Sequence, residues 1–348
     1  MERLMRRVWL GVAVLCLGQA ALFVRAGDVI DANRVQELLR TCQGMAAAED
    51  PNQGVSDEQA VRSFLETHEV LVDAKPLASV KDLFDALVDR PAGAKEVRIR
   101  AYEDREYRWF EVSAASGQLG VRELPLVEFC ADDRGLGFLR WRCCSGGAIR
   151  RVTKHLEGTP ALKGLFVDLR GNPGGHLVEA LAFADQFLPK GTEMVRLADS
   201  VEDFQKGRFS LVCRAMVDPV YHFPVVFITD GATGSTAEAM VAVFKANWIG
   251  VSIGRRSNGD AFAYRGREGQ VQTKRGEISL ISVPNFPVYH NKGIKPDNVT
   301  SQDIRPKTLF ANADYYYAAL DGMGGQQKGT LHRACALLAQ LAVLPPTE

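Results

Sequence analysis

The sequence predicts an α/β fold for residues 116–348. Short apolar runs there alternate with amphipathic stretches about a dozen residues long, which is the pattern of βαβ units. The runs "LFVDLR" (165–170) and "FPVVFITD" (223–230) are almost continuously apolar, as expected for strands that both faces of a parallel sheet bury. These two observations together favour a largely parallel sheet covered by helices.

The elements follow one another in a regular order. We expect strands at residues 135–143, 161–170, 223–230 and 248–254, and helices at 146–158, 176–188 and 235–247. In an open sheet of this kind, ligands gather where strands end and helices begin.

Residues 1–26 have the three parts of a secretory signal peptide. A short basic start, "MERLMRR", precedes an apolar run and then a small residue, Ala26. We therefore expect export to the periplasm or the extracellular space after cleavage. The alternative is an uncleaved anchor, which would keep the protein at a membrane.

Residues 27–115 form a separate module in this interpretation. Helical spacing extends from Asp28 to about His68, and a strand, a turn, a helix and a hairpin follow from Glu69. This second part is similar to the C-terminal half of a bacterial PDZ domain, although no carboxylate-binding loop precedes it. We expect a small degenerate PDZ-like or helical module.

Composition excludes several classes of protein. Basic and acidic residues balance at 42 each, which argues against a nucleic-acid partner. The seven cysteines match no zinc site and are too few for a disulfide scaffold. The adjacent Cys143 and Cys144 are interpreted as apolar fillers, with a redox or catalytic role or a bridge to another cysteine as the alternatives. No metal or cofactor is expected.

Two strand-to-helix junctions carry candidate chemistry. In "VDLRGNPGGHLVEA" (167–180), glycines follow a buried strand and expose backbone amides that would accept a developing oxyanion, or else simply make a tight turn. In "ITDGATGSTAEAMV" (228–241), Ser235 and Glu238 have the spacing of a capping box. Ser235 also stands on a sharp turn, the position at which a nucleophile is presented.

Together these segments resemble the carboxy-terminal processing, or tail-specific, serine peptidases. "LFVDLRGNPGGHL" and "FITDGATGSTAEAMVAVFKANWIGVSIG" are the strong matches, and "GLGFLRW" and "NKGIKPD" support them. The resemblance covers about residues 135–306. It implies a layered, crotonase/ClpP-like peptidase core that cleaves peptide bonds of flexible protein or peptide substrates.

The resemblance also implies roles for particular residues. Ser235 falls on the nucleophile, while Thr236 and either Gly174 or Gly175 fall on the backbone donors to the oxyanion. In the main branch of the family, the base is a lysine 25 residues after the serine. Asp260 occupies that position here, and no lysine lies between Lys245 and Lys274.

Three explanations for the missing lysine remain open. One is a different base: His290, oriented by Asp260, is the first candidate, and His176 is the second. Relatives of the tricorn and chlamydial type, which use serine with histidine and glutamate, give this explanation a precedent. Another is an inactive pseudopeptidase that binds peptides or acts as a scaffold. In the third, Asp260 itself acts as the base, which would require burial to raise its pKa.

Overall fold

The computed structural model describes residues 68–72, 75–76, 97–103, 106–115, 118–260, 262–264, 278–287, 289–300, 304–322 and 330–342. The predicted signal peptide, the helices expected before His68 and the helix expected in the PDZ-like segment lie outside the described residues. The chain divides into two compact units, Met1–Glu103 with Phe110–Glu123 and Asp104–Trp109 with Leu124–Glu348.

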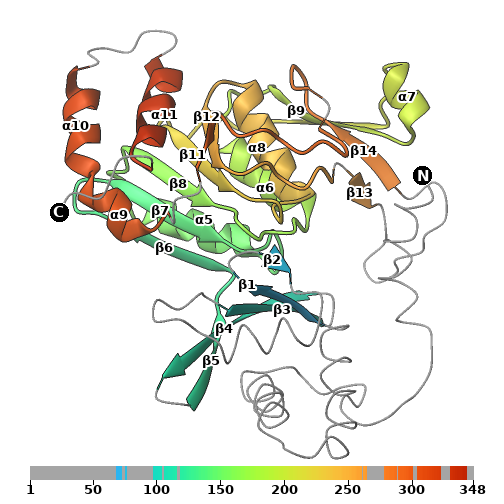
Figure 1. Ribbon diagram of the computed structural model, residues 1–348. Coiled ribbons are helices and arrows are strands. Elements are labelled where there is room, and N and C mark those ends of the chain that lie inside the picture. The colour runs from blue at the N-terminus through green and yellow to red at the C-terminus, as the bar shows by residue number, and fades with distance from the viewer. Residues whose placement is uncertain are drawn as a thin grey trace, which may run out of the picture. The chain divides into compact units, whose positions relative to one another are not determined.

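A six-stranded sheet forms the centre of the second unit (Figure 1). Its spatial order is β15 (Asn298–Val299), β12 (Gly250–Gly254), β11 (Val225–Thr229), β8 (Gly164–Asp168), β7 (Leu136–Trp141) and β6 (Val127–Ala131). All neighbours are parallel except β6 and β7, which pair antiparallel. The four expected strands of the parallel sheet are therefore confirmed.

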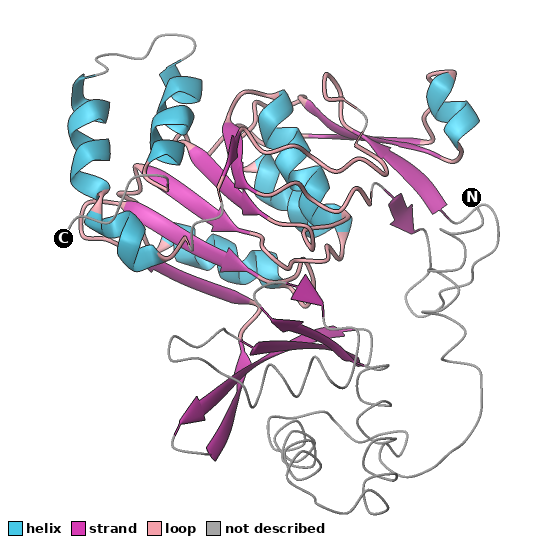
Figure 2. Ribbon diagram, viewed as in Figure 1, coloured by secondary structure: helices cyan, strands magenta, loops and turns pink. Residues whose placement is uncertain are grey.

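Helices cover both faces of this sheet (Figure 2). Residues of α5 (Ala148–Glu157), α6 (Leu177–Asp185) and α8 (Thr236–Ala246) pack into one apolar cluster. Residues of α9 (Pro306–Ala311), α10 (Ala313–Gly322) and α11 (Thr330–Gln340) pack into another. Strand β11 supplies Val225 and Phe227 to the first cluster and Val226 and Ile228 to the second. Its continuous apolar run therefore fills two cores, as the sequence predicted.

A second, antiparallel sheet belongs to the same unit. Its order is β10 (Leu211–Arg214), β9 (Glu193–Ala198), β14 (Ile278–Ser282) and β13 (Phe262–Tyr264), with α7 (Val201–Gln205) between β9 and β10 in the chain. The sequence did not predict this sheet.

The described part of the first unit is also a sheet. Its order is β2 (Lys75–Pro76), β1 (His68–Val72), β3 (Val97–Glu103), β4 (Glu106–Ala115) and β5 (Gln118–Leu124). The first residues of β4, 106–109, and the last residue of β5, Leu124, are assigned to the second unit. The hairpin expected within residues 95–112 is present as β3 and β4. The PDZ-like assignment itself stays a prediction.

Among the described cysteines, Cys130, Cys144, Cys213 and Cys335 are free thiols, and the Cys143 thiol donates to the Gly174 carbonyl at 3.2 Å. Cys143 and Cys144 are fully buried beside the glycine turn, in agreement with the interpretation as apolar fillers. Within the described residues, no helix has the length and apolar character needed to cross a bilayer.

Candidate active site

Ser235 stands at the start of α8 in a strained backbone conformation. Its φ is 50° and its ψ is −121°, in a region that residues with a Cβ rarely occupy. The preceding strand, β11, ends at Thr229, so six residues turn the chain from the sheet edge into the helix. The predicted capping box between Ser235 and Glu238 is present. Ser235 is therefore both a helix cap and a side chain held on a sharp turn.

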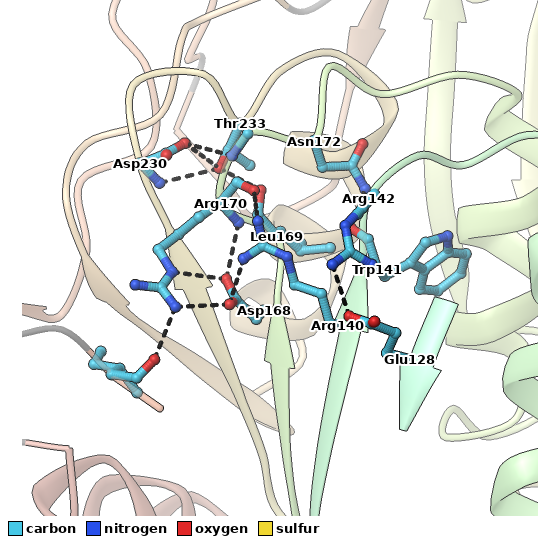
Figure 3. Close-up of polar contacts among 12 residues, drawn as sticks. Glu128, Arg140, Trp141, Arg142, Asp168, Leu169, Arg170, Asn172, Asp230 and Thr233 are labelled. Atoms are coloured by element: carbon cyan, nitrogen blue, oxygen red, sulfur yellow. Dashed lines mark hydrogen bonds and ion pairs between the residues drawn. The ribbon is translucent and has the colours of Figure 1, made fainter. Parts of the chain in front are cut away.

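Backbone and side-chain bonds join this turn to the glycine turn after β8 (Figure 3). Asp230 accepts from the Gly171 amide through Oδ1 at 2.9 Å, and the Gly234 amide donates to the carbonyl of Asn172 at 2.9 Å. The hydroxyl of Thr233 accepts from the Asp230 amide at 3.0 Å. The two junctions that the sequence singled out thus form one connected structure.

Gly174 and Gly175 differ in what their amides do. The Gly174 amide donates to Oδ1 of the buried Asn172 at 2.8 Å. Gly175 is exposed, and no described residue accepts a hydrogen bond from its amide or from that of Thr236. The Thr236 hydroxyl donates to the Gly175 carbonyl at 2.8 Å, which ties the two segments together. The sequence left Gly174 and Gly175 as alternatives, and this bonding leaves the Gly175 amide available.

Only glycine fits at position 174. Its φ is +101°, and a Cβ there would lie 2.7 Å from the Ser235 Cβ and 2.9 Å from the Thr236 nitrogen. The absence of a side chain therefore lets the glycine turn pack directly against the Ser235 turn.

Glu238 is fully buried and accepts four hydrogen bonds. Oε2 accepts from the amides of Ser235 at 3.0 Å and Asp260 at 2.8 Å, and Oε1 accepts from the Gly259 amide at 2.7 Å and from the Ser257 hydroxyl. Burial raises the pKa of Glu238 to about 7, against the opposite effect of these four donors. One carboxylate oxygen thus bridges the backbones of Ser235 and Asp260.

His290 lies close enough to Asp260 for the two side chains to interact electrostatically. Burial lowers the pKa of His290, and the charge of Asp260 opposes that effect. The Asn291 amide donates to the Gly259 carbonyl at 2.8 Å, which fixes the loop of His290 to the loop of Asp260. Nε2 of His290 lies 2.8 Å from Nδ2 of Asn291.

Part of the chain that forms this site is similar to a known protein family. Residues 137–301 match the model of peptidase family S41. The carboxy-terminal processing protease CtpA of Bacillus subtilis (strain 168) is 27% identical over 200 residues, which are 54% of this chain and 40% of that protein. Residues 137–301 of this chain are therefore similar to peptidase family S41. The predicted resemblance to the carboxy-terminal processing peptidases is confirmed.

Two further proteins are similar to parts of this chain. A putative tricorn protease homolog 2 of Streptomyces coelicolor (strain ATCC BAA-471 / A3(2) / M145) is 27% identical over 169 residues, which are 46% of this chain and 13% of that protein. The structure of a photosystem II D1 C-terminal processing protease shares 18% identity, with a TM-score of 0.42, and the match covers 70% of this chain and 64% of that one. The chain spans less than half the length of the curated relatives described above.

Lys245 does not lie near Ser235. Lys245 lies ten residues after Ser235 on α8, about 15 Å along the helix axis. Its ammonium donates to Asp297 at 2.8 Å, to Ser252 at 3.1 Å and to the Lys295 carbonyl at 3.1 Å. Asp260, at the position of the usual lysine, instead has its amide bonded to Glu238.

His176 has a different setting from His290. It precedes α6 as the N-cap residue, and its amide donates to the Cys144 carbonyl at 2.6 Å. The ring is exposed and forms no hydrogen bond with another described residue. The position directly after Gly175 puts it beside the glycine turn.

A buried ion cluster supports the glycine turn from beneath (Figure 3). Arg170 binds Asp168 through two bonds of 2.9 and 2.8 Å and also donates to the Ile304 carbonyl at 2.8 Å. Arg140 pairs with the same carboxylate and donates to the Arg170 carbonyl at 2.7 Å. Burial would raise the pKa of Asp168, but the two guanidinium groups hold it below its ordinary value. Asp168 and Arg170 therefore have a structural role beside the glycine turn.

Sequence reasoning missed three residues that build the site. Asn172 and Asp230 connect the two turns, and Ser257 connects the Asp260 loop to Glu238. Asn172 stands inside the quoted glycine motif, so its place was visible in the sequence although its bonds were not. Within the described residues, no group of three or more His, Cys, Asp or Glu side chains has the arrangement of a metal site.

Proposed function

We propose that this chain is a serine endopeptidase that cleaves flexible protein or peptide substrates. One observation carries the proposal: Ser235 stands on a strained turn beside two backbone amides, those of Gly175 and Thr236, that no described residue uses. A nucleophile next to paired free amides is the arrangement that acyl transfer requires.

In this mechanism, the Ser235 hydroxyl oxygen forms a bond to the scissile carbonyl carbon. The carbonyl oxygen becomes negative and is stabilised by the two amides. The peptide C–N bond then breaks, the departing amine takes the proton that Ser235 gave up, and water hydrolyses the resulting ester. The chain's own residues supply each of these groups, without a cofactor.

The proposed base is His290, with Asp260 as its orienting partner. The pKa of His290 is lowered by burial, so the ring is neutral and able to accept a proton near pH 7. The charge of Asp260 stabilises the imidazolium that forms when the proton arrives. His176 is the second candidate because it follows Gly175 directly.

We also propose export, from the signal-peptide pattern of residues 1–26. The protein would then act on exported or extracellular chains. Flexible substrates are favoured because an extended segment must reach Ser235 at the edge of the sheet.

The test is cleavage of casein, an unfolded substrate, by the chain from Gly27 onward. We expect cleavage by the wild type and a loss of at least about 10³-fold in Ser235→Ala, because the other groups cannot replace the nucleophile. Mass spectrometry of the phosphonyl adduct that forms on Ser235 when a fluorophosphonate loses fluoride provides a second readout. Cleavage retained in Ser235→Ala would overturn the proposal.

The base is identified with the same assay. We expect His290→Ala to lower kcat by about 10²–10⁴-fold and His176→Ala to keep kcat within a few-fold of the wild-type value. The loss of kcat in Asp260→Ala should lie between these two. If His176→Ala is the variant that loses activity, the assignment of the base is reversed. If neither the wild type nor Ser235→Ala cleaves casein across pH 5–9 and both still bind peptide, the protein is an inactive peptide-binding relative instead.

A further inference from the structure

The Glu238 carboxylate does more than cap its own helix. A capping box needs only the bond from the Ser235 amide, but three further bonds come from residues 257–260, about twenty positions later in the chain. Nothing in the geometry of α8 requires these bonds. They join the helix start to the loop that occupies the place of the usual lysine.

Ser257 extends this connection to the loop of His290. Its hydroxyl donates to Glu238 and accepts from the Ile294 amide at 2.7 Å, and its own amide donates to the Ile294 carbonyl at 3.2 Å. Ser257 is only 6% exposed, so water does not compete well for these bonds. The Glu238 cluster, defined here as Glu238, Ser257 and the amides of Ser235, Gly259 and Asp260, therefore contacts three separate segments.

The two loops pack so closely that neither glycine at their contact has room for a side chain. A Cβ at Gly259 would lie 2.7 Å from the Gly293 nitrogen, and one at Gly293 would lie 2.1 Å from the Ser257 carbonyl oxygen. The Asn258 amide donates to the Thr233 carbonyl at 2.9 Å, next to the Ser235 turn. The loops pack against each other and against that turn.

We propose that Glu238 is a positioning residue that, through Ser257, assembles the Asp260 loop and the His290 loop against Ser235. In the main branch of the family, the base is a single lysine. Here the proposed base, His290, and its orienting partner, Asp260, lie on two different loops. Both loops must be held in place relative to Ser235, and the hydrogen bonds of the Glu238 cluster connect them to it. The inference rests on the proposed function for its catalytic consequence, but its structural part does not.

The experiment compares Glu238→Gln and Ser257→Ala with Asp297→Asn. Asp297 is the matched control because its Oδ2 accepts from Lys245 at 2.8 Å and from the Ser252 amide at 2.7 Å, at the opposite end of the same helix. Glutamine has one carbonyl oxygen and turns its NH₂ group toward amides that also donate, so it cannot replace the four bonds. Hydrogen–deuterium exchange, the rate of fluorophosphonate labelling of Ser235, and kcat and KM on casein peptides are measured for each variant.

For Glu238→Gln, we expect at least tenfold faster exchange confined to residues 257–260 and 289–294 and at least a tenfold lower kcat, with KM within about threefold. Ser257→Ala should affect residues 289–294 most, and Asp297→Asn should leave both segments and kcat unchanged. A uniform rise in exchange, or equal effects of Glu238→Gln and Asp297→Asn, would overturn the positioning role. An unreactive Ser235 in the wild type would refute the proposed function, and the exchange pattern would still decide whether Glu238 holds the loops.

Discussion

At the scale of single residues, the Thr236 side chain holds the carbonyl of Gly175, whose amide the proposed reaction uses. It is 2% exposed, and its hydroxyl donates to the Gly175 carbonyl. We expect Thr236→Val, which keeps the shape and the backbone amide, to lower kcat by up to about tenfold, because the loss of one buried hydrogen bond loosens Gly175. Thr236→Ser keeps the hydroxyl and should retain most of the activity. A larger loss in Thr236→Ser than in Thr236→Val would show that the methyl packing, and not the hydroxyl, is what matters.

The sequence predicted the local part of this site and not the long-range part. Ser235 and Glu238 are three residues apart, so the capping box followed from helix geometry alone. The bonds from Glu238 to residues 257–260 depend on how β12 returns beside β11, and no periodicity in the sequence encodes that contact. Likewise, the sequence left Gly174 and Gly175 as alternatives for a backbone donor to the oxyanion. The choice between them depended on the buried side chain of Asn172, which occupies the Gly174 amide.

At the scale of elements, strands with fully buried runs were predictable. Strands β8 and β11 are apolar on both faces, and an unbroken apolar run bounded by turn residues has few other interpretations. Strands β9 and β14 pair across more than 80 residues of chain, and β10 has partly exposed residues along its whole length. Their sequences carry neither a long buried run nor a hairpin turn of two residues, so the antiparallel sheet was missed.

The cluster that joins β7 to β8 supports an element-scale prediction. Asp168 is 1% exposed and neutralises Arg140, whose side chain is 8% exposed. We expect Asp168→Asn to lower the free energy of unfolding by about 3–5 kcal/mol, because a buried guanidinium would lose its counter-charge. Glu202→Gln, at an exposed pair with Lys206, should change it by less than about 1 kcal/mol. Urea unfolding of both variants measures the difference, and similar small changes in the two would contradict a buried, interdependent ion cluster.

At the scale of the whole molecule, the stability of the fold depends on pH through ionisable groups whose pKa values folding shifts in opposite directions. The pH ranges in which these groups change stability overlap. The pKa of Asp168 is lowered in the folded state, so its stabilisation is present above about pH 4 and is lost at more acid pH. The pKa of His290 is also lowered, so the folded state loses stability as pH falls below about 6.5, where the unfolded histidine takes up a proton. Glu238 has the opposite effect, since its folded pKa is raised.

Glu238 binds its proton more tightly in the folded protein than in the unfolded chain. The stabilisation from this difference is complete below the ordinary pKa of 4.5 and is lost as pH rises to about 7, and it amounts to about 3 kcal/mol. Glutamine at this position does not titrate. The difference in free energy of unfolding between the wild type and Glu238→Gln should therefore fall by that amount between pH 4.5 and pH 7.5 and then stay level. Because Asp168 and its two arginine partners are the same in both proteins, the contribution of Asp168 cancels in the difference. Urea unfolding at half-unit intervals of pH measures it, and a difference that stays constant across the window would mean that the four donors keep Glu238 ionised throughout.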